Sequence, residues 1–151
     1  MQVQMSHNIY TPFLEATRNV FHLMLDLSDI AESPAENFKF DDTLNISIGV
    51  VGDLKGEIIY KFPSNTSLSM VTIMSGMEID SVDEFVTSAI SEIANIISGN
   101  VLNLLAETDI NCDILPPVLK LSDDTDEYNI SNDFCIKTSV GSVCLGLRLN
   151  F

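Results

Sequence analysis

The clearest alternation of hydrophobic and polar residues lies at the C-terminal end of the chain. In "SVCLGLRLNF" (142–151) every second residue is apolar, which predicts a strand with one buried face. A tight turn at Val140 and Gly141 would join this strand to the segment before it as a hairpin. The resulting register places Phe134 opposite Leu147, Ile136 opposite Leu145, and Asp133 opposite Arg148 as a cross-strand ion pair.

Further β-rich runs lie in the first half of the chain and after its longest apolar segment. "NISIGVVGDLKGEIIYKF" (45–62) contains two of them around the turn-forming residues 52–56, which predicts a second hairpin. Its register stays open because the alternation slips near Gly49. "DINCDILPPVLKL" (109–121) is expected to be extended and interrupted at Pro116 and Pro117.

Apolar residues at helical spacing predict two helices in addition to the longest one. Thr11 followed by Pro12 is typical of an N-cap and first helical position, so we expect the first helix to begin there and to end near Asp29. A loop or short edge segment should follow in "ESPAENFKFDD" (32–42). A short helix is expected over residues 64–77, with its methionines filling an irregular core.

The longest helix is predicted over residues 81–107. Ser81 and Glu84 have the spacing of a capping box, in which each side chain binds the backbone N–H of the other. One side of the helix is broad and apolar, formed by Val82, Phe85, Val86, Ala89, Ile90, Ile93, Ile97, Val101 and Leu104. On the opposite side, residues spaced by three or four form a polar stripe: Ser88, Ser91, Glu92, Asn95 and Gly99.

These elements predict one α+β domain that spans residues 1–151. The chain has no internal repeat and no linker, and 151 residues are enough for one hydrophobic core. Because the predicted strands are joined mostly by hairpins, we expect long helices packed on a largely antiparallel β-sheet.

Charge and composition exclude several classes of partner. Seven basic residues against 22 acidic residues give a net charge of −15, which disfavours binding to nucleic acid and to anionic membranes. No uninterrupted run of 18 apolar residues is present, and the N-terminus lacks the pattern of a secretory signal, so we expect a cytoplasmic protein. Cys112, Cys135 and Cys144 are odd in number and form no C-x-x-C pair, so we expect small buried side chains, with no disulfide scaffold or zinc site.

The sequence contains no motif that predicts a self-contained catalytic site. Nucleophile elbows, phosphate-binding loops and metal-binding spacings are all missing, so no metal ligands are predicted. The polar stripe is then the remaining candidate, either as a solvated helix face or as a working surface. Glu92 and Asn95 are one turn apart and project together, and the small residues Ser88, Ser91 and Gly99 would let another protein approach closely.

The pattern E-x-x-N-x-x-x-G-N, formed by Glu92, Asn95, Gly99 and Asn100, resembles the signature helix of the CheC/CheX/FliY phosphatases of bacterial chemotaxis. The segments "TPFLEATRNVF", "GDLKGEIIYKF" and "PPVL" are similar to CheX in the same order, although the two prolines fall slightly short of the position of the family's proline. The single Glu/Asn pair matches CheX better than CheC, which has two. Ser88 fits the Asp or Ser that the family has four positions before the Glu.

The resemblance implies a CheC-like fold, a homodimer associated through sheet edges, and a phosphatase that acts on a phosphorylated CheY-type receiver domain. In such a protein Asn95 would orient the attacking water and Glu92 would pair with a lysine of the receiver, which also brings its own Mg²⁺. This chain itself would bind no cofactor. The alternative is a non-catalytic docking or adaptor module of a chemotaxis or flagellar-switch complex, and the intact Glu92/Asn95 pair favours the enzyme.

Overall fold

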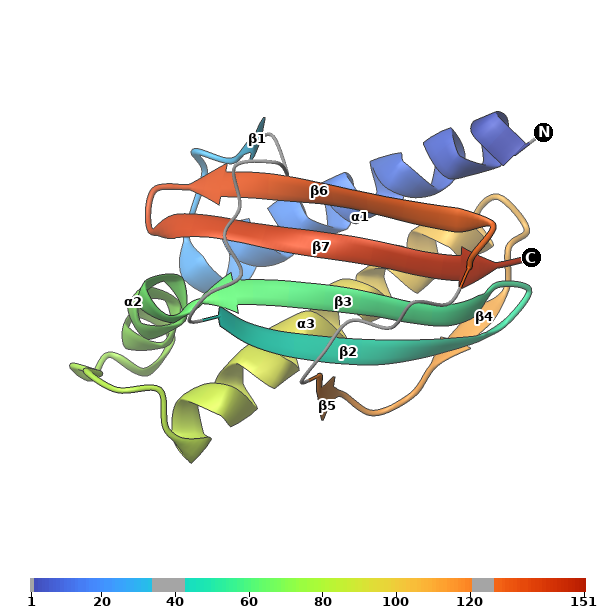
Figure 1. Ribbon diagram of the computed structural model, residues 1–151. Helices are drawn as coiled ribbons and strands as arrows, with labels where there is room; N and C mark the ends of the chain where they lie inside the picture. The colour runs from blue at the N-terminus through green and yellow to red at the C-terminus, as the bar shows by residue number, and fades with distance from the viewer. Residues whose placement is uncertain (1, 34–42, 121–126) are drawn as a thin grey trace.

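An antiparallel sheet forms the framework of the molecule. The computed structural model describes residues 2–33, 43–120 and 127–151, with side chains described from residue 11 onward. Within these residues, seven strands form one sheet in the order β1-β6-β7-β3-β2-β4, and β5 also pairs with β2 (Figure 1). The strands are β1 (Ala31–Ser33), β2 (Thr43–Gly52), β3 (Lys55–Pro63), β4 (Cys112–Ile114), β5 (Val118–Leu119), β6 (Ile130–Thr138) and β7 (Gly141–Asn150).

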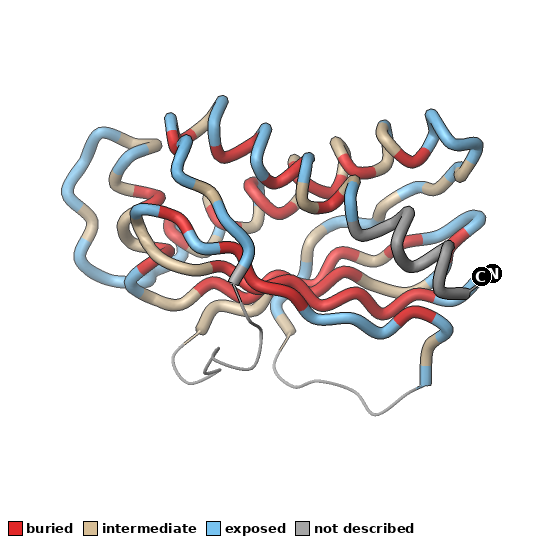
Figure 2. The backbone as a smooth tube through the Cα atoms, turned by 90° about the horizontal axis from the view of Figure 1, so that it is seen from above, coloured by how far each residue is buried: buried red, intermediate tan, exposed pale blue. Residues whose placement is uncertain are grey.

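Three helices cover one face of this sheet, which confirms the predicted α+β class (Figures 1 and 2). They are α1 (Gln2–Leu25), α2 (Ser64–Ser75) and α3 (Glu84–Ala106). α1 and α3 pack against each other, and α3 also contacts β2 and β4. The hydrophobic core lies between this helical layer and the sheet, where the buried positions gather (Figure 2).

The hairpin predicted within residues 45–62 is confirmed as β2 and β3. Ile46 pairs with Tyr60 and Ile48 with Ile58, and all four side chains are buried in the core. Gly52, just before the turn, has a φ of +119°, and a Cβ atom there would lie 2.7 Å from the carbonyl oxygen of Asn111. Glycine is therefore required at this position both by backbone conformation and by space.

The terminal hairpin is also present, but its predicted register is wrong by two residues. Ser139 and Val140 form the turn between β6 and β7, one residue earlier than predicted. A shift of two keeps every side chain on its predicted face, since the period of a strand is two. The observed cross-strand pairs are Thr138–Gly141, Ile136–Val143 and Phe134–Leu145.

The predicted ion pair between Asp133 and Arg148 is present across a diagonal of the hairpin. Asp133 Oδ1 lies 3.0 Å from Arg148 Nη2, although the residue directly opposite Asp133 is Gly146. A Cβ atom at Gly146 would lie 2.8 Å from the same carboxylate oxygen. The missing side chain at Gly146 therefore leaves the space through which Asp133 reaches Arg148.

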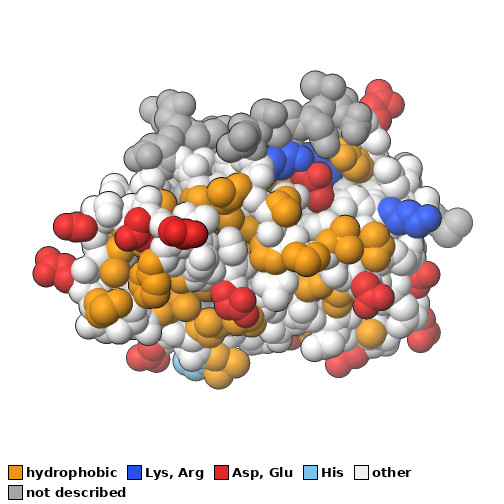
Figure 3. Space-filling model, turned by 90° about the horizontal axis from the view of Figure 1, so that it is seen from below, with side chains coloured by type: hydrophobic (Ala, Val, Ile, Leu, Met, Phe, Trp, Pro, Cys, Tyr) orange, Lys and Arg blue, Asp and Glu red, His pale blue; other side chains and the backbone are white. Residues whose placement is uncertain are grey.

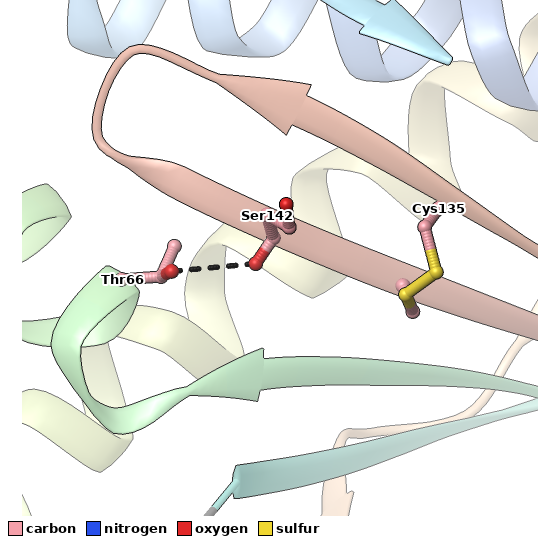
Figure 4. The surroundings of a disulfide bond; sticks show 4 residues. Thr66, Cys135 and Ser142 are labelled. Carbon is pink, nitrogen blue, oxygen red and sulfur yellow. Dashed lines mark hydrogen bonds between the residues drawn. A yellow bond between two sulfur atoms is a disulfide. The ribbon is translucent and has the colours of Figure 1, made fainter. Parts of the chain in front are cut away.

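The prediction of small buried cysteine side chains without a disulfide is confirmed for the burial of Cys135 and Cys144, but it is wrong about their pairing. Cys135 and Cys144 are buried cross-strand partners on β6 and β7 and are joined as a disulfide (Figure 4). The predicted register would have placed Cys135 opposite Gly146, so the error in the turn concealed the pairing. Cys112 is free and half-buried, and its Sγ accepts a hydrogen bond from the backbone N–H of Leu54 at 3.4 Å.

The predicted boundaries of the first helix are wrong at both ends. α1 begins at Gln2, so Thr11 is not its N-cap and Pro12 lies inside the helix. Proline removes one hydrogen bond of the helix and its ring crowds the carbonyl group four residues earlier, but a helix can continue through it at a cost in stability. The helix ends at Leu25, because the next residue, Asp26, has a φ of +54°. Aspartate is one of the few residues that adopt this left-handed conformation readily.

The short helix predicted over residues 64–77 is confirmed as α2. Met70 is buried, whereas Met77 lies beyond the helix end and is 53% exposed. The hydroxyl of Thr66 donates a hydrogen bond to the carbonyl oxygen of Ser142 at 3.3 Å, which connects the first turn of α2 to β7 (Figure 4).

Two further predictions are settled in part. β1 confirms an edge segment at Ala31–Ser33, while most of "ESPAENFKFDD" lies outside the described residues.

Among the helices of the described residues, α3 is long and apolar enough to cross a membrane by length and composition, contrary to our expectation from uninterrupted runs. Its apolar side packs against α1 and the sheet, and the core helix of a globular domain meets the same criterion.

Candidate functional site

The predicted stripe is carried by α3, whose start differs from the prediction. Asp83 is the N-cap residue in an extended conformation, and its carboxylate accepts a hydrogen bond from the backbone N–H of Val86 at 3.0 Å. The Ser81–Glu84 capping box is therefore wrong, because the helix begins at Glu84, three residues later than expected. The aspartate satisfies the same type of unpaired N–H that the serine would have served.

The two sides of α3 differ as the helical pattern predicts. Its buried residues are Val86, Ile90, Ile93, Ala94, Ile97, Ser98, Val101 and Leu105. On the other side, Glu92 and Ser88 are exposed, and Ser91, Asn95 and Gly99 are partly exposed. Since residues three and four apart are neighbours on a helix surface, these five residues form one continuous stripe that another molecule can reach.

Glu92 and Asn95 are available for intermolecular contacts. They are three residues apart, so they project from adjacent turns of one rigid element. Among the described residues, neither side chain takes part in a hydrogen bond or an ion pair of the chain itself. A carboxylate offers acceptors for a cationic partner, and an amide offers both a donor and an acceptor. Together they can position a water molecule and a positive charge of a bound molecule.

Gly99 has no packing role within the described part of this chain. A Cβ atom added there would find no heavy atom within 4 Å. Glycine inside a helix costs about 1 kcal/mol relative to alanine, so this position carries a cost that intramolecular packing does not explain. The space above Gly99 is open to a second molecule.

Asn100 differs from the other members of the quoted motif. Its side-chain amide donates a hydrogen bond to the carbonyl oxygen of Ile96 at 2.9 Å, one turn back along α3. This contact holds the side chain against its own helix. Asn100 therefore supports the local structure of α3, while Glu92 and Asn95 point outward.

The buried side of α3 is attached to the centre of the sheet below the stripe. The hydroxyl of Ser98 lies 2.8 Å from the hydroxyl of Tyr60 on β3 and donates to the carbonyl oxygen of Ala94 at 2.9 Å. Burial raises the pKa of the Tyr60 hydroxyl, which is therefore neutral in the folded protein. Sequence reasoning missed this contact because an isolated Tyr and Ser carry no signal of proximity.

The sequence also misplaced two apolar residues at the start of α3. Val82 and Phe85 were assigned to the core-facing side, but they are 39% and 48% exposed. Val82 precedes the helix. Phe85 lies seven residues before Glu92, so Phe85 and Glu92 project from nearly the same side of α3. The helical spacing of Phe85 from Glu92 was the signal that could have found it.

Acidic, cysteine and histidine side chains do not gather into a metal-binding cluster in the part of the chain that the structure describes. No group of three or more is placed to hold an ion there. The predicted absence of a metal site in this chain stays a prediction.

Comparison with known proteins connects this helix to a family. The family model described as "Chemotaxis phosphatase CheX" matches residues 44–138, which include α3 and most of the sheet. A curated protein of Thermotoga maritima, named CheY-P phosphatase CheX, is 34% identical over 88 residues, 58% of this chain. The matched part spans 57% of the length of that relative.

Solved structures share the fold over nearly the whole chain. The chemotaxis protein CheX of Vibrio vulnificus has a TM-score of 0.81 at 22% identity, covering 94% of this chain and 96% of its own. A chain of the CheX–CheY–BeF3–Mg complex of Borrelia burgdorferi has a TM-score of 0.74 at 21% identity, covering 94% and 97%. With a family model that matches more than half of the residues, this chain belongs to the CheX family.

Proposed function

We propose that this protein is a phosphatase that hydrolyses the aspartyl-phosphate of a CheY-type receiver domain. The observation that carries the proposal is that exposed Glu92 and partly exposed Asn95 lie together on the helix that the family model includes. The named activity of the Thermotoga maritima relative and the CheY partner in the Borrelia burgdorferi complex support it. Both residues belong to one helix, so their spacing is set before any partner binds.

Asn95 would position the attacking water. Hydrolysis of a phosphoryl group needs an in-line nucleophile and charge stabilisation more than it needs a covalent partner on the enzyme. The Asn95 amide can accept a hydrogen bond from a water molecule through its oxygen and donate one through its nitrogen. Inserted into the pocket of the receiver, it would hold that water opposite the bond that breaks.

Glu92 would determine how the receiver docks. A carboxylate on the rim of the contact attracts an ammonium group, and a charge-assisted hydrogen bond between them is stronger than a neutral one. We assign to Glu92 the pairing with a lysine of the receiver that lies beside the phosphoryl group. Ser88, Ser91 and Gly99 would then line the contact, where these small residues allow the two backbones to approach.

Mg²⁺ would come bound to the receiver. The ion neutralises the phosphoryl oxygens during transfer, a role that enzymes of this reaction type require. The residues of this chain supply the water-positioning amide and the docking carboxylate, and the receiver supplies the phosphate, the metal and the lysine. This division explains why the stripe needs no covalent nucleophile of its own.

We also propose a cytoplasmic protein of one domain that forms a homodimer. The β4–β5 edge of the sheet supports the dimer, because Leu115, Val118 and Leu119 are between 49% and 59% exposed there. Exposed apolar residues beside unpaired strand edges favour association with another chain.

A docking module without turnover is the competing function, and one experiment separates it from the enzyme. The decay of a phosphorylated CheY receiver is followed with and without this protein. Accelerated decay supports the phosphatase, and binding without acceleration supports the docking module. Excess chelator should stop the accelerated decay, because the ion is needed for phosphoryl transfer. Calorimetry of this protein alone with Mg²⁺ should show no binding, and a stoichiometric ion would contradict the assignment of the metal to the receiver.

A further inference from the structure

Four large apolar side chains are exposed around the start of α3. Ile73 near the end of α2, Met77 in the connection, Val82 and Phe85 are 43%, 53%, 39% and 48% exposed. We call these four residues the apolar end. In Figure 3, hydrophobic side chains lie at the side of the molecule where α2 and the start of α3 are, and others continue across the centre of the same face. Exposed apolar patches rimmed by polar residues are typical of protein–protein interaction sites.

The apolar end continues the polar stripe. Phe85 precedes Glu92 by seven residues, which is nearly two helical turns and leaves the two side chains about 20° apart around the axis. Along the axis, Phe85 lies about 10 Å from Glu92 and about 15 Å from Asn95. A molecule that covers Glu92 and Asn95 with a surface of ordinary size therefore also reaches Phe85.

The surroundings of the apolar end carry charge of one sign. Between Lys61 and Lys120 the sequence has no Lys, Arg or His, while it has eight Asp or Glu residues. Four of these carboxylates, from Glu78, Asp80, Asp83 and Glu84, flank the apolar end in sequence. In Figure 3, acidic side chains surround the hydrophobic ones at this side of the molecule. The complementary partner presents apolar side chains bordered by Lys or Arg.

We propose that the apolar end is a second docking point for the receiver domain, separate from the Glu92/Asn95 pair. The receiver would place an apolar patch bordered by basic residues against Phe85, about 15 Å from the pocket that Asn95 enters. This inference rests on the proposed function for the identity of the partner. Phe85 supplies affinity through burial of its ring, and the carboxylates accelerate and orient the encounter.

The two docking points are expected to affect different kinetic constants. Removal of the Phe85 ring weakens binding equally before and during the reaction, so KM rises while kcat stays the same. Removal of Asn95 reduces kcat, because its water is needed only in the reaction itself. This difference separates the two proposals in one set of measurements.

The test compares Phe85→Ser with Phe151→Ser. Both phenylalanines are about half exposed, at 48% and 52%, and Phe151 lies at the opposite end of the molecule, where the C-terminus is marked (Figure 1). The probe is Thermotoga maritima CheY with Mg²⁺, loaded with beryllofluoride for affinity and phosphorylated for turnover. Phe85→Ser should weaken binding and raise KM by about tenfold or more, with kcat unchanged. Phe151→Ser should behave as the unmodified protein.

The carboxylates provide an independent readout. The double variant Glu78→Gln, Asp80→Asn should slow association with CheY and reduce its dependence on salt, with little effect on dissociation. If the double variant and the unmodified protein associate with CheY at the same rate at low salt, these carboxylates do not attract the receiver, and the proposed charge complementarity is wrong.

Three results would overturn the apolar end as a docking point for the receiver. The first is unchanged affinity in Phe85→Ser, and the second is failure of the unmodified protein to bind CheY. The third is a change of oligomeric mass in Phe85→Ser, which would show that a second copy of this chain covers the surface. If CheY binds through Phe85 but is not dephosphorylated, the docking surface stands and the phosphatase proposal fails.

Discussion

The hydroxyl of Tyr60 donates a hydrogen bond to the hydroxyl of Ser98, 2.8 Å away, and so joins the middle of β3 to the buried side of α3. The direction follows from proton counting, because the single hydroxyl proton of Ser98 is committed to the carbonyl oxygen of Ala94. Both side chains are fully buried. The contact holds α3, and with it the Glu92/Asn95 pair, in one position above the sheet.

This contact predicts a decrease of stability in alkaline solution. Burial of the Tyr60 hydroxyl is the main cause that raises its pKa. In the unfolded chain tyrosine ionises near pH 10, so the folded state keeps its full advantage below about pH 10. Above that pH the free energy of unfolding should fall by up to about 1.4 kcal/mol per pH unit.

Urea unfolding between pH 7 and pH 11 measures this effect, with Tyr60→Phe as the comparison. The variant should lose about 1 kcal/mol at pH 7, because one buried hydrogen bond is missing. Its stability should then fall less steeply above pH 10 than that of the unmodified protein. Equal slopes in the two proteins would show that Tyr60 does not titrate differently on folding.

Asn95→Ala should abolish most of the phosphatase activity and leave the fold intact. The side chain is only partly buried, and its loss removes the water-positioning amide, which is expected to cost about 10²-fold or more in turnover. Single-turnover decay of phosphorylated CheY measures the effect. Asn103→Ala is the matched control, since Asn103 is an exposed asparagine two turns further along α3. Turnover near that of the unmodified protein in Asn95→Ala would rule out the mechanism.

Glu92→Ala should weaken productive docking, and Glu92→Lys should weaken it more. Removal of the carboxylate loses its attraction for a lysine, and a lysine in its place adds repulsion between like charges. Titration of CheY against each variant measures the change. Glu107→Lys changes the net charge equally at the exposed end of α3 and should bind CheY normally. Normal binding and turnover in Glu92→Lys would mean that the carboxylate only faces water.

Gly99→Ala should stabilise the protein while it impairs docking. The new methyl group meets no heavy atom within 4 Å, and alanine favours the helix, so the free energy of unfolding should rise by roughly 0.5–1 kcal/mol. A closely approaching receiver would meet the methyl group, and its affinity should fall. The two effects are measured by urea unfolding and by CheY titration.

Gly76→Ala is the control for Gly99→Ala. Its Cβ would also find nothing within 4 Å, but Gly76 has a φ of +70°, so this variant should be destabilised by about 1 kcal/mol. A Gly99→Ala protein that is more stable and binds CheY as before would show that the glycine does not serve docking.

Light scattering at micromolar concentration should give twice the mass of 16.6 kDa that one chain has. Val118→Lys should shift the protein toward the monomer, because a charge on an exposed edge strand opposes association there. A mass of one chain for the unmodified protein would exclude the homodimer. An unchanged dimer in Val118→Lys would place its interface elsewhere.

The helices and strands of this fold were predictable where hydrophobic residues repeat with one regular spacing, either that of a strand or that of a helix. The alternation of β7 and the long apolar face of α3 located both elements closely, because each pattern repeats over several turns or residue pairs. The Glu92/Asn95 stripe followed from the same period. Its role required the resemblance to a family, because an exposed carboxylate and amide have the same appearance on any solvated helix.

The errors arose where local chemistry allows two outcomes. Thr11 and Pro12 are compatible both with the start of a helix and with a helix that continues through the proline. A turn placed one residue too late preserved the faces of the terminal hairpin and hid the pairing of Cys135 with Cys144. Phe85 was assigned to the core because it is apolar, although its spacing of seven residues from Glu92 places it on the side of the polar stripe.

Glu92 and Asn95, the two proposed functional residues, belong to one helix, so the pair could be transferred to another protein. Their separation is a property of the helical repeat and does not depend on how distant segments of the chain come together. The same two residues could be written into any exposed helix without rebuilding a pocket around them. The pair itself would supply the water-positioning and docking groups. The surface around the helix would determine which receiver domain binds.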